Sequence, residues 1–237
     1  MINGIKAVFK KQVKDTFKNM GVLVQFIVFP AVAFAMTLFV AQGNDDIPDT
    51  MFANMMAAVF VGMALIPTVA GFIAEDKERK SLRFLAMAGV KPGAYLLGIG
   101  GTVFLLSAAP IVAFGFIAGL EGAQFMQFVA AMFSGVAAST LIGLSIGIFT
   151  NSQQEATGLS MPVAMVLGFG PMIAEFNETV EQLFAPFYTQ QFNVITNSFT
   201  GYGAEVLTWQ PFAIIWANVA VLVVLFVVAF AKKGLKA

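Results

Sequence analysis

The 237-residue sequence contains no cysteine and no histidine, and only 11% of its residues are charged. Without cysteine there are no disulfides or thiolate metal sites, and without histidine the commonest metal ligand and general base is missing. We therefore expect no metal site. An average globular domain carries charge on roughly a quarter of its residues. Hydrophobic residues instead make up 59% of this chain, which indicates a membrane protein.

Six apolar runs are long enough to cross a bilayer as helices. A helix needs roughly 20 apolar residues to span about 30 Å of hydrocarbon. The fifth run is short and contains Pro162 and Pro171, so we expect it to be broken or kinked. The sequence predicts an all-α integral membrane fold, because each helix satisfies its own backbone hydrogen bonds in lipid. The runs are 21–41, 51–74, 93–119, 124–149, 157–174 and 210–231.

Lysine and arginine occur in only three segments: before the first run, between the second and third, and after the sixth. With six spans these three segments share one side of the membrane. The positive-inside rule identifies that side as cytoplasmic. We therefore predict a multi-pass protein of the cell membrane with both termini in the cytoplasm. The basic residues are Lys6, Lys10, Lys11, Lys14, Lys18, Lys77, Arg79, Lys80, Arg83, Lys91, Lys232, Lys233 and Lys236.

Two segments outside the spans carry apolar residues at helical spacing. In residues 1–20 the lysines form a separate row, which predicts an amphipathic helix at the membrane interface. Residues 175–209 are too polar to span, yet they keep an apolar stripe that includes Phe176 and Leu183. We expect one or two short amphipathic or re-entrant helices there, on the outer face. The whole chain, 1–237, is interpreted as a single transmembrane domain.

The segment 75–92, between the second and third runs, holds the densest charge in the chain. Eight of the nine residues from Glu75 to Arg83 are charged or hydroxylic. One interpretation is a solvated turn that only fixes topology. However, a topology signal needs only basic residues, and the acidic residues here cancel much of it. Mixed charge followed by apolar residues favours docking into a groove of another protein.

The same segment resembles a motif of ATP-binding-cassette exporter permeases of the second membrane type. Those permeases carry, between spans two and three, a run similar to Glu-Arg-Glu-x-Gly-Thr-Leu-x-x-Leu-x-x-x-Pro, followed later by Gly-Lys. The matching residues here include Glu78, Arg79, Leu82 and Leu85. The chain departs from the motif at Lys80, where glycine is usual. Further departures are a late proline, Pro92, and Gly98-Ile99 in place of Gly-Lys. With six spans and an amphipathic N-terminal helix, the resemblance covers the whole chain.

The resemblance implies a permease that moves a hydrophobic or amphipathic cargo, a peptide or drug-like compound, outward by alternating access. Segment 75–92 becomes a cytoplasmic coupling helix held by a separate ATPase, and 1–20 an elbow helix. Two ATPase subunits and a second permease are implied, with a homodimer expected. The predicted ATPase-coupling residues are Glu75, Asp76, Lys77, Glu78, Arg79, Lys80, Ser81, Leu82, Arg83, Phe84 and Leu85.

The chain contains no Gly-x-x-x-x-Gly-Lys-Ser/Thr phosphate loop. We therefore predict that it is not an enzyme, and that ATP and magnesium bind to the partner ATPase. No nucleic-acid partner is expected, whereas membrane lipid is. Two alternative functions remain open: an ATPase-docked membrane anchor or sensor, and an ion-coupled carrier.

The interiors of the predicted spans contain no Lys, Arg, Asp or Glu. Charge at mid-membrane is costly and usually functional, so its absence disfavours ion coupling. Methionine and phenylalanine adapt to varied apolar partners and suggest a hydrophobic cargo path. The alternative is that they fill lipid-facing or core positions. The candidate path residues are Asn54, Met56, Phe60, Met63, Met161 and Met165.

Small residues recur every four positions in the fourth run, at Gly135, Ser139, Gly143 and Gly147. In lipid, a stripe of small residues lets two helix backbones approach closely. The pattern predicts tight packing within the subunit, with a dimer seam as the alternative.

Overall fold

The computed structural model describes residues 2–44, 47–199 and 209–234, and across these ranges its regular secondary structure is helical. Six helical segments are long and apolar enough to span a membrane, which confirms the predicted all-α fold. Their bounds agree with the predicted runs to within four residues, because span length depends only on the local run of apolar side chains. The segments are Met20–Ala41, Thr50–Glu78, Pro92–Ile117, Gly122–Phe149, Gln153–Ala174 and Gln210–Lys233.

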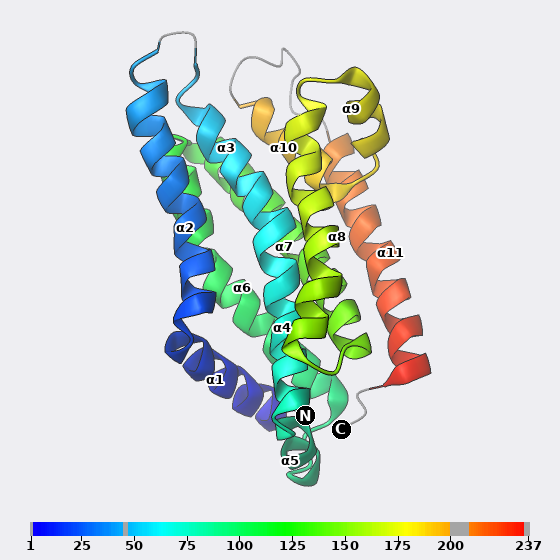
Figure 1. Ribbon diagram of the computed structural model, residues 1–237. Coiled ribbons are helices and arrows are strands. Elements are labelled where there is room, and N and C mark those ends of the chain that lie inside the picture. Colours follow the sequence, from blue (N-terminus) through cyan, green and yellow to red (C-terminus); the bar gives the residue numbers. More distant parts are fainter. Residues whose placement is uncertain (1, 45–46, 200–208, 235–237) are drawn as a thin grey trace.

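Figure 1 shows the six segments as an upright bundle. The first contains α2 (Met20–Met36) and the π-helical turn η1 (Thr37–Ala41). The second contains α3 (Thr50–Val59), the π-helical turn η2 (Phe60–Ala64) and α4 (Leu65–Glu78). The others are α6 (Pro92–Ile117), α7 (Gly122–Phe149), α8 (Gln153–Ala174) and α11 (Gln210–Lys233).

The two ends of the bundle differ in character (Figure 1). One end, called the terminal end, carries α1 (Ile2–Lys18), α5 (Ser81–Met87) and the end of α11. The opposite end carries α9 (Glu178–Phe184) and α10 (Tyr188–Asn197). All lysines and arginines in the described ranges lie at the terminal end. This is the charge segregation expected from the sequence.

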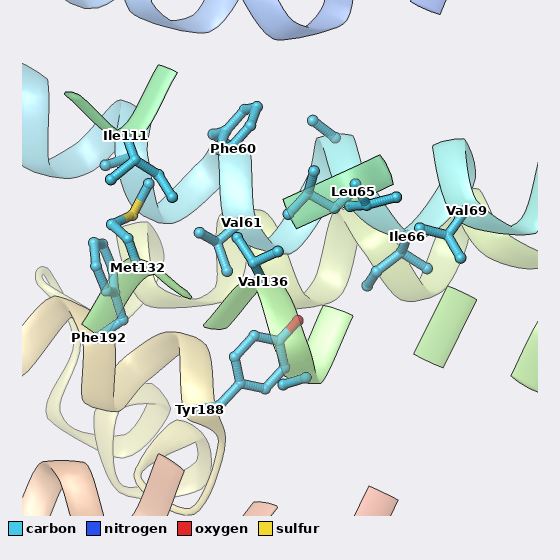
Figure 2. Packing of buried hydrophobic residues seen from close by; sticks show 14 of the residues in the cluster. Phe60, Val61, Leu65, Ile66, Val69, Ile111, Met132, Val136, Tyr188 and Phe192 are labelled. Atoms are coloured by element: carbon cyan, nitrogen blue, oxygen red, sulfur yellow. The ribbon is translucent and has the colours of Figure 1, made fainter. Parts of the chain in front are cut away.

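The second span forms the centre of the bundle. Its most apolar window is 78% buried, compared with 17% for the first span and 6% for the sixth. Figure 2 shows its residues Phe60, Val61 and Leu65 packing among side chains of the neighbouring helices, including Ile111 and Met132. The first and sixth spans lie at the periphery and leave many apolar side chains exposed.

The π-helical turn η2 lies just before Pro67 in the second span. Proline has no N–H to donate, and its ring crowds the carbonyl four residues earlier, which here belongs to Met63. A π-helical turn widens the helix locally. We infer that η2 accommodates Pro67 and so lets the central span remain helical as far as Glu78.

The small-residue stripe of α7 packs against the second span, as the sequence predicts. Ser139 Oγ donates a hydrogen bond of 2.6 Å to the carbonyl of Val61. A Cβ on Gly143 would lie 2.8 Å from the Ile66 carbonyl oxygen. One on Gly147 would lie 2.9 Å from the Cβ of Ile73. The contact within the subunit therefore occupies the stripe, and the dimer seam is the wrong interpretation for it.

The fifth span differs from its prediction. Helix α8 begins at Gln153 rather than at residue 157 and continues through Pro162 and Pro171 without interruption. The expected break is therefore absent. Each proline removes one backbone hydrogen bond, and membrane helices tolerate this loss because neighbouring helices and local adjustments compensate for it.

Residues 175–199 form two helices of contrasting burial. Helix α9 has no buried residues, whereas eight of the ten residues of α10 are buried. Tyr188 and Phe192 of α10 point toward α7 in Figure 2. The Tyr188 hydroxyl lies 2.8 Å from Ser139 Oγ, and the Phe192 ring lies 5.9 Å from that of Phe128. Helix α10 thus re-enters the bundle. Residues 200–208 of the predicted outer segment lie outside the described ranges.

Candidate functional site

The charged segment between the second and third spans is a helix, a sharp turn and a second helix. Helix α4 continues to Glu78, so the first four charged residues belong to its last turn. Lys80 then adopts the left-handed conformation, with φ of 57°, and α5 begins at Ser81. This conformation favours glycine. It explains why glycine is usual at the matching position of the motif that the sequence resembles.

Asp76 connects four helices at the terminal end. It is only 4% exposed, and its carboxylate accepts three hydrogen bonds. Lys11 of α1 donates to Oδ1 at 2.6 Å, and Ser81 of α5 donates to the same oxygen at 2.8 Å. The Tyr95 hydroxyl of α6 donates to Oδ2 at 2.9 Å. We call these four residues the Asp76 cluster. It satisfies a buried carboxylate that would otherwise be costly in this environment.

Lys77 and Glu78, which follow Asp76, bind the turn between α7 and α8. Lys77 Nζ donates to the carbonyls of Gly147, Ile148 and Thr150 at 3.0, 2.6 and 2.8 Å. Glu78 Oε2 accepts a bond of 3.0 Å from the backbone N–H of Gln153. The cation therefore meets the negative end of α7 and the anion meets the positive end of α8. We call this contact the Lys77–Glu78 clamp.

Helix α5 has an inner and an outer side. Leu82 is buried and Leu85 is half-buried, and both pack against the core of the bundle. Phe84 and Met87 are 67% and 69% exposed at the tip of the molecule. Lys80 and Arg83 are exposed as well. We call the set Lys80, Arg83, Phe84 and Met87 the α5 outer surface.

The eleven predicted coupling residues thus occupy different environments. Asp76, Lys77, Glu78 and Ser81 bond within the subunit, as described above. Glu75 and Arg79 form an ion pair of 2.8 Å and line a cleft against α1. Lys80, Arg83 and Phe84 project outward, and Leu82 and Leu85 anchor the helix. The segment therefore combines a bracing side and a free side, which its charge pattern alone did not distinguish.

Sequence reasoning missed several members of this site. Lys11 and Tyr95 bind Asp76 from 65 and 19 residues away in the chain. The signal for Tyr95 was its polar hydroxyl in an apolar span, because buried tyrosine hydroxyls usually have a partner. Met87 completes the α5 outer surface, and only its position on the helix reveals that it is exposed.

The candidate cargo-path residues lie in three environments. Asn54 is 2% exposed and donates a 3.1 Å hydrogen bond to the Thr196 carbonyl, while Phe60 is fully buried. Met56 and Met63 are half-buried against the core. Met161 and Met165 are exposed on the outer face of α8. The structure does not bring these six residues together in one place.

Phe60 instead takes part in an aromatic cluster. Its ring centroid lies 5.8 Å from those of Phe26 and Phe114 and 6.0 Å from that of Phe29. Offset and edge-to-face contacts of this kind stabilise a core beyond simple burial. The cluster joins the first, second and third spans near the middle of the bundle.

Comparison with known proteins identifies the family. The family model described as "ABC-2 family transporter protein" matches residues 35–231. A search of curated proteins found no significant match. The family match covers the second to fifth candidate spans in full, nearly all of the sixth, only the last part of the first, and the whole of the α4–α5 segment. The chain therefore belongs to the ABC-2 family of transporter proteins, and it is a multi-pass transmembrane permease subunit of an ATP-binding-cassette transporter.

Proposed function

We propose that this permease exports a hydrophobic or amphipathic cargo, a peptide or drug-like compound, and that a separate ATPase drives it by docking on α5. The α5 outer surface is the observation that carries the proposal. Two large apolar side chains, Phe84 and Met87, are exposed beside two cations at the tip of the terminal end. Exposed apolar residues rimmed by charge are typical of protein–protein contacts.

The bracing side of the segment supports a coupling role. A displacement of α5 acts on α1 and α6 through the Asp76 cluster. It acts on α7 and α8 through the Lys77–Glu78 clamp. Coupling between distant sites needs contiguous contacts of this kind that can change together. An ATPase that moves α5 would therefore tilt most of the bundle, as alternating access requires.

The interior of the bundle favours an apolar cargo. Within the described spans, the acidic and basic side chains lie at the helix ends and not in the middle. The core is instead lined by phenylalanine, methionine and aliphatic side chains. A polar or ionic cargo would find few partners there. Outward direction rests on the resemblance to exporters.

The full transporter is proposed to contain two permeases, as a homodimer, and two ATPases. ATP and magnesium bind to the ATPases in this proposal. The alternative of an ATPase-docked anchor or sensor shares the α5 contact but predicts no transport. The alternative of an ion-coupled carrier predicts no ATPase partner.

Purification of the tagged permease from its native membrane, followed by reconstitution in liposomes, tests the proposal. The wild type is expected to retain an ATPase whose turnover rises when apolar peptides or drug-like compounds are added. The double substitution Phe84→Asp with Met87→Asp should reduce ATPase retention about tenfold or more, because it places two charges in an apolar contact. Phe176→Asp with Leu183→Asp, at exposed apolar positions of the opposite end of the bundle, is the matched control and should retain the partner.

Two results contradict the proposal. Full ATPase retention by the Phe84→Asp, Met87→Asp protein shows that α5 is not the docking helix. ATPase binding without stimulation by any member of a broad apolar panel favours the anchor or sensor.

A further inference from the structure

A polar cleft separates the elbow helix α1 from the end of the second span. Its volume is about 490 Å³. Pockets that hold small molecules have volumes of roughly 300–1,000 Å³. The lining residues are Gln12, Asp15, Thr16, Lys18, Asn19, Met20, Phe72, Glu75 and Arg79. The α5 outer surface is not among them, so the cleft is distinct from the proposed ATPase contact.

The cleft lies where the membrane meets water. Met20 is the first residue of the first span, and Phe72 lies in the second span, near its charged end. Met20 is 69% exposed, so in a membrane it would contact the surrounding lipid. Asp15, Lys18, Glu75 and Arg79 belong to α1 and to the charged end of the second span. The depth therefore matches that of a phospholipid headgroup, with the apolar edge toward the acyl chains.

The charges of the cleft are balanced and include donors and acceptors. Asp15 and Glu75 are anionic, and Lys18 and Arg79 are cationic. Glu75 and Arg79 pair at 2.8 Å, and Asp15 lies 3.4 Å from Lys11. Lys18 forms no ion pair with any described residue. A ligand that carries one positive and one negative group fits this lining better than an anion or a cation alone.

Two further features point to a polar ligand. Gln12 lines the cleft and is only 4% exposed, yet its side-chain amide has no hydrogen-bond partner among the described residues. The amide atoms of Gln12 are not themselves fully buried, so they open to the cleft and can bond to a ligand there. In addition, the helix α2 begins at Met20, beside Lys18. The Asn19 side chain caps the Val22 N–H, and the N–H groups of Met20 and Gly21 at this helix start have no backbone partner among the described residues, so they can bind an anion.

We infer that this cleft binds the headgroup of a zwitterionic phospholipid of the phosphoethanolamine type. The phosphate lies against Lys18 and the N-terminus of α2, and the ammonium lies against Asp15 and Glu75. Gln12 completes the polar contacts. A bound lipid of this kind joins α1 to the second span beside the Asp76 cluster. The site is independent of the cargo and of the direction of transport.

The amine distinguishes this headgroup from related lipids. A primary ammonium donates hydrogen bonds to carboxylates, whereas the quaternary ammonium of phosphatidylcholine has no N–H to donate. Phosphatidylglycerol has the phosphate but no amine. We therefore expect binding of phosphatidylethanolamine to exceed that of either lipid by about tenfold, the factor of one charge-assisted hydrogen bond.

Native mass spectrometry of the full-length permease in detergent tests the inference. The protein is titrated separately with phosphatidylethanolamine, phosphatidylcholine and phosphatidylglycerol of identical acyl chains. One saturable phosphatidylethanolamine per permease is expected. Lys18→Ala and Asp15→Asn should each weaken its binding about tenfold. Lys14→Ala is the matched control, because it removes a lysine from an exposed position of the same helix outside the cleft, and it should bind as the wild type does.

Additional measurements distinguish a phospholipid from other occupants of the cleft. Thermal unfolding without lipid checks that the variants are folded. O-phosphoethanolamine and inorganic phosphate, added without acyl chains, show whether a soluble phosphate compound binds equally well. Equal binding of all three lipids, equal weakening by Lys14→Ala, or saturation by inorganic phosphate alone overturns the inference. Exclusion of lipid by the co-purified ATPase also overturns it, since the cleft is then a protein contact.

Discussion

Asp76 is a buried carboxylate at the junction of four helices. Removing a carboxylate from water is unfavourable unless its oxygens are hydrogen-bonded, and Lys11, Ser81 and Tyr95 provide three donors. Because the partners come from α1, α5 and α6, the cost of moving any one helix includes the loss of these bonds. A single side chain thus links α1 to the proposed coupling helix α5.

Asp76→Asn is expected to lower the free energy of unfolding by roughly 1.5–3 kcal/mol, because charge-assisted bonds become neutral and the Lys11 ammonium loses its buried counter-ion. Denaturant unfolding in mixed micelles measures this. Asp49→Asn, the same substitution at an exposed carboxylate outside the cleft, should change stability by no more than about 0.5 kcal/mol. Equal losses for both variants would show that the cluster does not stabilise the junction.

The small-residue stripe of α7 packs closely against the second span. Gly143 and Gly147 face the carbonyls and β-branched side chains of α4 with no room for a methyl group. In lipid, where the hydrophobic effect does not drive helices together, this close packing supplies much of the attraction. The Lys77–Glu78 clamp lies at the terminal end of the same interface, so packing and electrostatics hold one pair of helices.

Gly143→Ala is expected to destabilise the protein by roughly 1–3 kcal/mol, since the new methyl group would lie 2.7 Å from the Val69 Cβ and 2.8 Å from the Ile66 carbonyl oxygen. Gly71→Ala is the control. Gly71 lies in α4 with nothing within 4 Å of the added Cβ, so this change should be neutral or slightly stabilising. Thermal unfolding in detergent compares the two. Equal thermal stability of the Gly143→Ala and Gly71→Ala proteins would show that α7 and the second span can move apart without loss of stability.

The molecule as a whole is polarised. Its basic residues within the described ranges lie at the terminal end, and the opposite end carries carboxylates such as Glu121, Glu175 and Glu178. The positive-inside rule predicts from this asymmetry that the basic end is retained in the cytoplasm. Cytoplasmic ATP would then be available to an ATPase bound at α5, as the proposed function requires.

Cysteine labelling tests this orientation cleanly, because the chain has no cysteine of its own. Ala123→Cys, exposed at the start of α7, should react with a membrane-impermeant maleimide in intact cells. Ala88→Cys, exposed just after α5, should react only after the membrane is permeabilised. The reverse pattern would place α5 outside the cell and remove the basis for ATPase docking.

The sequence by itself determined the six spans, the all-α class and the segregation of charge. Each of these depends on a local property: the length of an apolar run or the position of lysines along the chain. The stripe of Gly135, Ser139, Gly143 and Gly147 was also correctly read as packing within the subunit, because small residues at helical spacing have few other uses in lipid.

Only the tertiary structure decided which charged residues of the α4–α5 segment face inward. Lys11 meets Asp76 across 65 residues of chain, and Lys77 meets the end of α7 across more than 70. No local pattern encodes such partners, since burial of a charge depends on what another helix supplies. The insertion of α10 and the cleft beside α1 have the same origin. Local hydrophobicity selects the helices, whereas the packing between them selects which polar groups are paired and which remain available to a ligand.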